Sequence, residues 1–501
     1  MGFKLTAVYA VLVLGLSMSI LSAAPIAGPP AAVGGGFSQT LQPFPPPRSI
    51  RQSAVIGGKR VDYQLTVGSI ALKDENGKLL GEVVYTAFTV PGQDASRRPV
   101  TFAVNGGPGA ASAYLDLGAI GPKKVDFGGK QAYPSDPPIL HDNPNSWLDF
   151  TDLVFIDPIG TGYSRSRVDE AQTKQAFLTS KSDIEYLSRV VFDWLLQNDR
   201  MMSPKYLVGE SYGGDRVPRM AHYLQTTLGV GISGITMSSP ALDTGMSNED
   251  VLSTTLEMVN LPAMAAGHLE QQGMPVNAQT MEPIELYART QFVTDLLAGP
   301  ADQAATDRLS AKVAELTGLD PALVRRLNGR VDIWTYLRES HRQEGLVGSG
   351  YDSNYTTFNP FPAEEQEQPY DDPLFSRPTA LFVSAMTNLI VNQVGWKVNA
   401  RYYLNDFDLN RQFVRDDHDS PVAALREALA ADPTMSATIA NGYNDFACPY
   451  FMSKLILAQQ PAYVRQRVKL YVYPGGHMFY SRPGSAAAFR RDIKAVYESR
   501  Q

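Results

Sequence analysis

Hydrophobic positions along the chain form short apolar runs separated by longer mixed segments, a pattern typical of a buried parallel sheet wound with helices. Helical patterns lie between several of these runs, and an amphipathic helix closes the chain at 484–500. The predicted fold class is therefore α/β, with a doubly wound, mostly parallel sheet. The runs expected as its strands are PVTFAVNGG (99–107), DLVFIDPIG (152–160), KYLVGE (205–210), SGITMSS (233–239), SATIANGYND (436–445) and VKLYVYPGG (468–476).

Two features depart from this alternation. Two β-type runs, 61–72 and 81–90, precede the first parallel strand, and Asn76-Gly77 between them is a hairpin signal. Residues 243–417 are mostly helical in pattern and lack a strand–helix–strand rhythm. We therefore expect a helical cap insertion over one end of the sheet. The predicted domains are a first core part at 52–242, the cap insertion at 243–417 and a second core part at 418–501.

The N-terminal residues have the pattern of an export signal. A positive charge in MGFK precedes an apolar run and then small residues, which predicts a signal peptide over 1–27 rather than a transmembrane anchor. Residues 28–51 are rich in Pro and Gly and are expected to be an extended lead-in. The chain is thus predicted to be exported, with no stable membrane association after signal cleavage.

Net charge and cysteine content bear on the protein's partners and on its location in the cell. The net charge is −7 over 501 residues, and this balance makes nucleic acid an unlikely partner. Cys448 is the single cysteine, so no intrachain disulfide can form. An exported protein without disulfides fits a bacterial periplasmic or extracellular location better than a eukaryotic secretory one. No metal-ligand spacing or cofactor-binding fingerprint stands out, and we expect neither a metal nor a cofactor. The sequence does not predict the oligomeric state.

The stretch GESYG (209–213) marks a candidate nucleophile. Ser211 stands between two glycines where an expected strand ends and an expected helix begins, the context of a strained nucleophile turn. Such a serine needs a base and an acid later in the chain. His477 follows the last expected strand, and Asp445 follows the strand before it. Asn105 begins a glycine-rich turn, NGGPG, which could bring backbone N–H groups close to a ligand.

Together, VNGGPGAAS, GESYGG, NDFAC and PGGHMF resemble the serine carboxypeptidases, exopeptidases of α/β-hydrolase fold. The resemblance extends from about Val61 to the C-terminus and is diffuse through the insertion. It implies a serine carboxypeptidase that removes C-terminal residues from peptides or proteins through an acyl-enzyme intermediate, with a preference for acidic pH.

The resemblance also implies a role for each matching residue. Ser211 would be the nucleophile, His477 the general base and Asp445 the residue that orients it. The N–H groups of Gly107 and Tyr212 would form the oxyanion hole. The implied substrate-binding residues are Asn105, Gly106, Glu210, Cys448 and Met478. Because a carboxylate repels another carboxylate, Glu210 should bind the peptide terminus in its neutral form, with a raised pKa.

Two positions depart from the family pattern. Members usually have a glutamate fourteen positions after the asparagine of NGGPG, which pairs with the glutamate before the serine, and this chain has Ala119 there. Asp116 is a candidate substitute. The family's disulfide cysteine after NGGPG is replaced by Ala110.

The departure at Ala119 leaves two alternatives open. The same triad could serve an esterase or acyltransferase, which would not need to recognise a free carboxylate. A non-catalytic binding protein of α/β-hydrolase fold is the other alternative, against which the complete set of Ser211, Asp445 and His477 argues.

Overall fold

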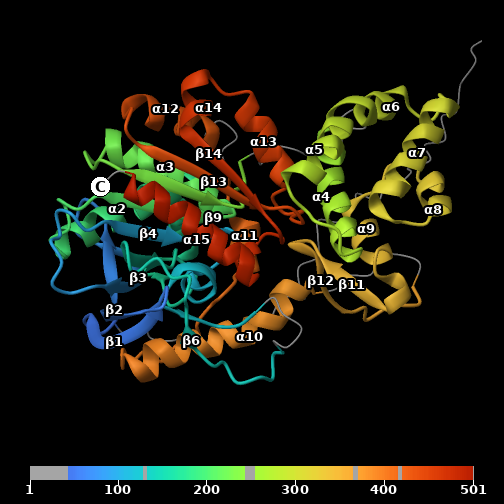
Figure 1. Cartoon of the computed structure of the whole chain (residues 1–501). Helices are drawn as coiled ribbons and strands as arrows, with labels where there is room; N and C mark the ends of the chain where they lie inside the picture. Colours follow the sequence, from blue (N-terminus) through green and yellow to red (C-terminus); the bar gives the residue numbers. More distant parts are fainter. Residues whose placement is uncertain (1–42, 128–132, 243–253, 365–370, 416–419, 500–501) are drawn as a thin grey trace, which may run out of the picture.

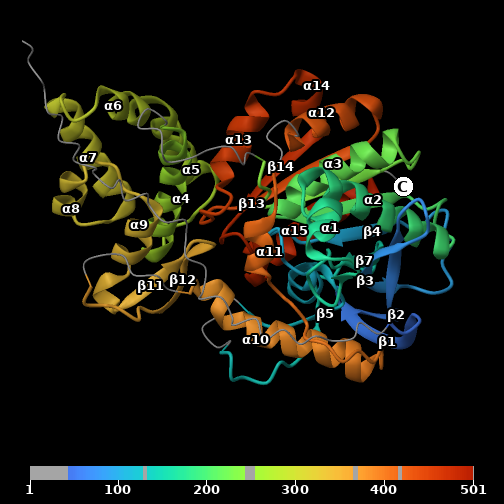
Figure 2. The same cartoon turned by 180° about the vertical axis from the view of Figure 1, so that it is seen from behind.

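The computed structural model of the chain describes residues 43–127, 133–242, 254–364, 371–415 and 420–499. Its centre is a twisted sheet in which six neighbouring strands run parallel, in the order β7-β4-β9-β10-β13-β14. An antiparallel extension, β1-β2-β3, joins at β7, and the short β8 pairs with β3. Both Figures 1 and 2 show the sheet between layers of helices. The α/β-hydrolase-type core expected from the sequence is confirmed. The strands of this sheet are β1 Arg48–Ile56, β2 Lys59–Lys73, β3 Leu79–Thr89, β4 Val100–Val104, β7 Asp152–Ile156, β8 Arg165–Ser166, β9 Lys205–Glu210, β10 Gly234–Ser238, β13 Ser436–Gly442 and β14 Val468–Tyr473.

Helices bury the two faces of the sheet in two separate hydrophobic clusters. On one face lie α1 Glu170–Phe177, α2 Ser180–Gln197, α3 Tyr212–Thr226, α12 Pro421–Ala431 and α14 Ala462–Arg467. On the other face lie the π-helix η1 Tyr114–Ile120, α10 Pro373–Thr387 with its π-helical continuation η4 Asn388–Gln393, and the C-terminal helix α15 Pro483–Glu498. Strands β4, β7, β9 and β10 are buried along their whole length because helices cover both faces.

A third hydrophobic cluster joins the insertion to residues that follow β13, namely Tyr443, Phe446, Tyr450 and Phe451. The helices of the insertion pack on one another beside the carboxyl ends of the parallel strands (Figures 1 and 2). The segment also contains an antiparallel pair, β11 with β12, which the helical pattern did not predict. The elements of this part are α4 Thr255–Gln271, α5 Ala278–Tyr287, η2 Ala288–Phe292, α6 Val293–Ala298, α7 Gln303–Thr317, α8 Pro321–Arg326, α9 Ile333–Glu339, η3 Arg342–Glu344, β11 Leu346–Ser349 and β12 Asp352–Phe358.

Five short or peripheral elements complete the described chain. The pair β5 and β6 is antiparallel and lies outside the main sheet. Helix α13 follows the loop after β13, and η5 follows the loop after β14. These elements are β5 Lys123–Lys124, β6 His141–Asp142, α11 Phe407–Gln412, α13 Tyr450–Ala458 and η5 Phe479–Ser481.

The described residues allow only part of the domain predictions to be compared with the structure. Strand β1 begins at Arg48, so residues 48–51 belong to the sheet and not to the predicted lead-in. The predicted hairpin is present: β2 pairs antiparallel with β3 across Asn76-Gly77. The predicted signal peptide at 1–27 and both predicted boundaries of the insertion, at 243 and 417, lie outside the described residues.

One described segment is long and apolar enough to cross a membrane, Pro373–Gln393, which comprises α10 and η4. Core helices of soluble proteins pass the same test. Phe382, Leu389 and Ile390 of this segment are buried in the cluster on one face of the sheet. Its apolar character is therefore explained by packing against the sheet.

Candidate active site

The predicted nucleophile stands on a sharp turn between β9 and α3. Ser211 has φ 61° and ψ −124°, a strained conformation for a residue with a side chain. A Cβ added to Gly209 would lie 1.8 Å from the Gly213 carbonyl oxygen, and one added to Gly213 would lie 2.3 Å from the Val104 carbonyl oxygen. The two glycines are therefore required by the close approach of strand and helix, as the GESYG pattern predicted.

The NGGPG turn lies directly against this serine turn. A Cβ added to Gly106 would lie 2.4 Å from the backbone nitrogen of Tyr212. Gly107 has φ 99°, a conformation that favours glycine. Tyr212 is the first residue of α3, so its N–H has no carbonyl partner within the helix. The predicted oxyanion-hole residues, Gly107 and Tyr212, thus lie in adjoining turns beside Ser211.

The predicted base and acid are hydrogen-bonded. His477 Nδ1 lies 2.8 Å from Asp445 Oδ2, and both side chains are buried. Asp445 Oδ1 accepts hydrogen bonds from the N–H groups of Ala447 (2.8 Å) and Cys448 (3.0 Å), which fix the carboxylate plane. Burial alone would lower the pKa of His477, but the Asp445 carboxylate outweighs it and raises that pKa well above its ordinary value. Asp445 therefore holds the ring and stabilises its protonated form.

The Cys448 side chain interacts with both the nucleophile and the base. Its thiol makes side-chain hydrogen bonds to both His477 and Ser211. Burial raises the pKa of the thiol, so Cys448 is not an activated thiolate. Met478 is also buried, within the cluster that includes Phe479 and Tyr480. The substrate contacts predicted for Cys448 and Met478 stay predictions.

Glu210, directly before the nucleophile, is fully buried with a donor on each carboxyl oxygen. Asn105 Nδ2 donates to Oε1 over 3.2 Å, and the Tyr480 hydroxyl donates to Oε2. Burial is the main cause that raises the pKa of Glu210, to about 7, although His477 and the hydrogen bonds from Tyr480 and Asn105 act to lower it. Glu210 can therefore hold a proton near neutral pH.

The Asn105 amide has a defined orientation. Its Oδ1 accepts a hydrogen bond from the Leu115 N–H over 3.0 Å, so its NH₂ group faces Glu210. Leu115 lies in η1, on which Ala119 stands four residues later. Both the NGGPG turn and η1 therefore position the amide that contacts Glu210.

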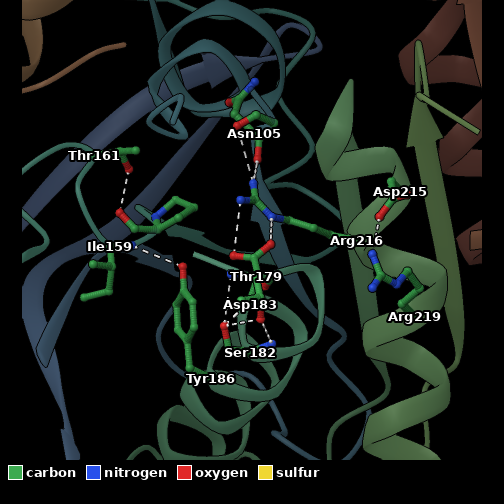
Figure 3. Close-up of polar contacts among 12 residues, drawn as sticks. Asn105, Ile159, Thr161, Thr179, Ser182, Asp183, Tyr186, Asp215, Arg216 and Arg219 are labelled. Atoms are coloured by element: carbon green, nitrogen blue, oxygen red, sulfur yellow. Dashed lines mark hydrogen bonds and ion pairs between the residues drawn. The ribbon is translucent and has the colours of Figure 1, made fainter. Parts of the chain in front are cut away.

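The sequence interpretation did not identify Arg216, a buried cation of α3 that supports the same turn. Its Nε donates to Asp183 Oδ2 of α2 over 2.6 Å, and its Nη1 donates to the Asn105 carbonyl oxygen over 2.5 Å (Figure 3). Arg216 thus ties α2, α3 and the NGGPG turn together. Its place in GESYGGDR, five residues after Ser211, was the only available signal.

Asp116 does not take the place of the missing family glutamate. Both of its carboxyl oxygens are buried without a hydrogen-bond partner among the residues that the structure describes, and its charged neighbour is Asp157. Asp116 is not among the groups that contact Glu210 or shift its pKa. The group that contacts Glu210 Oε2 is the Tyr480 hydroxyl instead.

The insertion contacts the loop that carries His477. The His477 N–H donates to the Tyr351 carbonyl over 2.5 Å, and the Gly476 N–H donates to Asp352 Oδ2 over 3.0 Å. The two rings of His477 and Tyr351 meet edge to face, with centroids 5.1 Å apart. The backbone position of the base therefore depends on residues that the insertion supplies.

The three triad residues and Asn105 come from the carboxyl ends of parallel strands. Asn105 follows β4, Ser211 follows β9, Asp445 follows β13 and His477 follows β14. A serine turn, a glycine-rich turn and a histidine–aspartate pair at one edge of such a sheet define an α/β hydrolase. A family model described as serine carboxypeptidase matches residues 69–317. Over these residues, just under half of its length, the chain matches this family.

Individual relatives agree with the family assignment. The chain is 29% identical over 157 residues to serine carboxypeptidase-like 29 of Arabidopsis thaliana, covering 31% of this chain and 30% of the relative. It is 30% identical over 217 residues to the pheromone-processing carboxypeptidase KEX1 of Tuber melanosporum, covering 42% of this chain and 30% of the relative. The matches therefore span about a third of the length of these curated relatives.

A solved structure extends the likeness of fold to most of the chain. The prohormone-processing carboxypeptidase Kex1Δp of Saccharomyces cerevisiae superposes with a TM-score of 0.56 and 14% sequence identity. The superposition covers 87% of this chain and 92% of that one. At this identity the likeness concerns the fold.

Proposed function

We propose that the protein is a serine-type carboxypeptidase that removes C-terminal residues from peptides through an acyl-enzyme intermediate. The observation that carries the proposal is the pairing of two features at one strand end. The Cys448 side chain is hydrogen-bonded to both Ser211 and His477 of the His477–Asp445 pair, and the buried Glu210, whose pKa burial raises to about 7, directly precedes Ser211. The first feature suits acyl transfer, and the second suits capture of a terminal carboxylate.

In the proposed reaction, His477 accepts the Ser211 hydroxyl proton as the hydroxyl oxygen attacks the carbonyl carbon of the last peptide bond. The N–H groups of Gly107 and Tyr212 stabilise the oxyanion. His477 then gives the proton to the leaving amine, and the C-terminal residue departs as a free amino acid. Water, deprotonated by His477, hydrolyses the acyl-enzyme and restores Ser211.

Recognition of the free C-terminus falls to Asn105, Gly106 and Glu210 in this proposal. Neutral Glu210 can donate its proton to the peptide carboxylate, whereas charged Glu210 would repel it. Since the pKa of Glu210 is about 7, binding of a free peptide C-terminus is expected to be strongest at acidic pH and to weaken as the pH rises through neutrality, which favours peptide hydrolysis at acidic pH.

The test is mass spectrometry of an N-terminally blocked peptide incubated with the wild type and with Ser211→Ala, at about pH 5 and about pH 7.5. Stepwise loss of C-terminal residues by the wild type alone, stronger at the lower pH, is the expected result. An amidated copy of the peptide is the matched control and should stay intact.

An esterase or acyltransferase is the second candidate, favoured by Ala119 at the position of the family's second acid. It would hydrolyse simple esters while leaving peptides with free and amidated termini equally untouched. A non-catalytic binding protein is the lesser candidate, and labelling of Ser211 by a fluorophosphonate probe would exclude it. Export, to a bacterial periplasm or the extracellular space, is also proposed, from the N-terminal pattern and the single cysteine.

A further inference from the structure

The side chain that is hydrogen-bonded to Glu210 Oε2 in this chain is a phenol and not a second acid. The Tyr480 hydroxyl donates to Glu210 Oε2, and the side chains of both residues are buried. Tyr480 lies in η5, three residues after His477, and η5 packs against η1, the helix that carries Ala119. The contact that the family pattern would assign to position 119 is therefore made by a residue of η5, which packs beside that position.

We propose that Tyr480 is the positioning residue for recognition of the substrate's terminal carboxylate, holding Glu210 in place of the absent second acid. This inference rests on the carboxypeptidase activity proposed above for the same site. Two neutral donors, Asn105 and Tyr480, bind different oxygens of Glu210 and thereby fix the plane of its carboxyl group. The acid proton of Glu210 can then be aimed at the incoming carboxylate.

Packing holds the phenol ring in this position. Tyr480 meets the rings of Phe127 and Phe479 edge to face, with centroid distances of 6.2 and 5.7 Å. Tyr114 also lies near Glu210, and its hydroxyl accepts a hydrogen bond from Asn405 Nδ2 over 2.8 Å, but the effect of Glu210 on it is electrostatic only. Tyr480 is thus the phenol that is hydrogen-bonded to Glu210.

A phenol in place of a second acid changes how binding of the substrate's terminal carboxylate depends on pH. The polar and charged groups that face Glu210 are Asn105 after β4, Asp445 after β13, His477 after β14, Tyr114 in η1 and Tyr480 in η5. Tyr480 keeps its proton, because burial raises its pKa well above the ordinary value. Recognition of the terminal carboxylate should therefore be lost when one group, Glu210, gives up its proton. The hydrogen bond from Tyr480 lowers the pKa of Glu210, and with it the pH at which recognition is lost.

The test compares Tyr480→Phe with the wild type and with Tyr497→Phe as the matched control. Tyr497 is another buried tyrosine, and its hydroxyl lies 2.8 Å from Thr101 Oγ1, away from Glu210. The assay is hydrolysis of a small ester without a carboxylate, inhibited by an N-acetyl amino acid or by the corresponding amide. This readout does not require peptide cleavage.

For Tyr480→Phe we expect ester hydrolysis within about twofold of the wild type. The inhibition constant of the N-acetyl amino acid should rise about tenfold near pH 5, because the variant loses a hydrogen bond to an ionisable group. The inhibition constant of the amide should not change. The pH at which inhibition is lost should move upward, because the bond that stabilises charged Glu210 is gone. Tyr497→Phe should change neither quantity.

Other outcomes overturn the inference. Equal loss of ester hydrolysis and of inhibition in Tyr480→Phe would mean a structural role. Unchanged inhibition in this variant, or no preference of the wild type for the free carboxylate over the amide, would mean that Tyr480 does not serve recognition. If the wild type binds the free carboxylate in this way but cleaves no peptide, the proposed function fails while the role of Tyr480 stands.

Discussion

Arg482 and Asp352 join the loop of the catalytic histidine to the insertion. Arg482, five residues after His477, donates from Nη2 to Asp352 Oδ2 of β12 over 2.8 Å. Its Nη1 pairs with Glu270 of α4, which also accepts from Asn444 beside Asp445. Asp352 Oδ2 in turn accepts the N–H of Gly476. Two elements of the insertion and the two loops that carry Asp445 and His477 thus share one charge network.

Breaking this network should impair chemistry on every substrate. In Arg482→Gln, the carboxylates of Glu270 and Asp352 lose their cation, and the loop before His477 loses a fixed anchor. We expect kcat to fall about tenfold or more for peptides and esters alike, because a small displacement of the base is costly. Steady-state kinetics on both substrates measures this effect.

The matched control is Arg491→Gln. Arg491 pairs with Asp492 on the surface, with 72% of its side chain exposed, and such pairs contribute about 0–1 kcal/mol. This variant should keep the wild-type kcat. A fall in kcat for Arg482→Gln on peptides alone would contradict a role in positioning the base and would place Arg482 in substrate binding.

Arg216 is expected to stabilise both the fold and the NGGPG turn. Arg216→Met leaves Asp183 buried without its cation, which should lower the free energy of unfolding by about 3–5 kcal/mol. It also removes the donor to the Asn105 carbonyl oxygen. Denaturant unfolding measures the first effect, and peptide kinetics measures the second.

The double variant Arg216→Met with Asp183→Leu separates the two effects. Replacing a buried ion pair by apolar residues is often neutral for stability, so unfolding should return towards the wild type. Peptide hydrolysis should stay impaired, since the Asn105 carbonyl still lacks its donor. Full recovery of activity in the double variant would show that Arg216 matters for the fold alone.

Strand order explains how much of this site could be predicted from the sequence. Ser211, Asp445 and His477 each directly follow an apolar run, and parallel strands bring such positions to one edge of a sheet. Strand β1 was missed because its apolar residues are few and much of it is exposed, as its burial pattern shows. The β11–β12 hairpin was missed inside a segment whose neighbours are helical.

The partners of Glu210 and of the NGGPG turn could not be predicted in the same way. Tyr480 and Glu210 are 270 positions apart, and Arg216 and Asn105 are 111 apart. Contacts of this kind depend on how η5, η1 and α3 pack, which neither hydrophobic periodicity nor strand order specifies. Asp116 illustrates the opposite error. Its position three residues before Ala119 in η1 suggested a contact with Glu210, but in the folded chain the two side chains do not interact.

Glu210 should make hydrolysis of free-carboxylate peptides decline with pH. Its pKa of about 7 means that the neutral form is lost as the pH rises through that value, so KM for such peptides should rise about tenfold per pH unit above it. Glu210→Gln is neutral throughout and should give a KM that is flat over the same range. A KM in Glu210→Gln that still rises near neutrality would assign the titration to another group.

Asp116 is predicted to make the folded protein less stable as the pH rises. Burial, followed by the repulsion from Asp157, raises the pKa of Asp116 well above its ordinary value, and its oxygens lack hydrogen-bond partners within the described parts of the chain. The unfolded chain releases this proton from about pH 4 upward, whereas the folded chain retains it until its own higher pKa. Stability from this group is therefore fully present at low pH and is lost as the pH rises.

Asp116→Asn removes this dependence, because asparagine does not titrate. Urea unfolding at a series of pH values should show the variant close to the wild type below about pH 4 and increasingly more stable above it. A difference between Asp116→Asn and the wild type that stays constant with pH would mean that the effect of Asp116 lies in packing rather than in its proton.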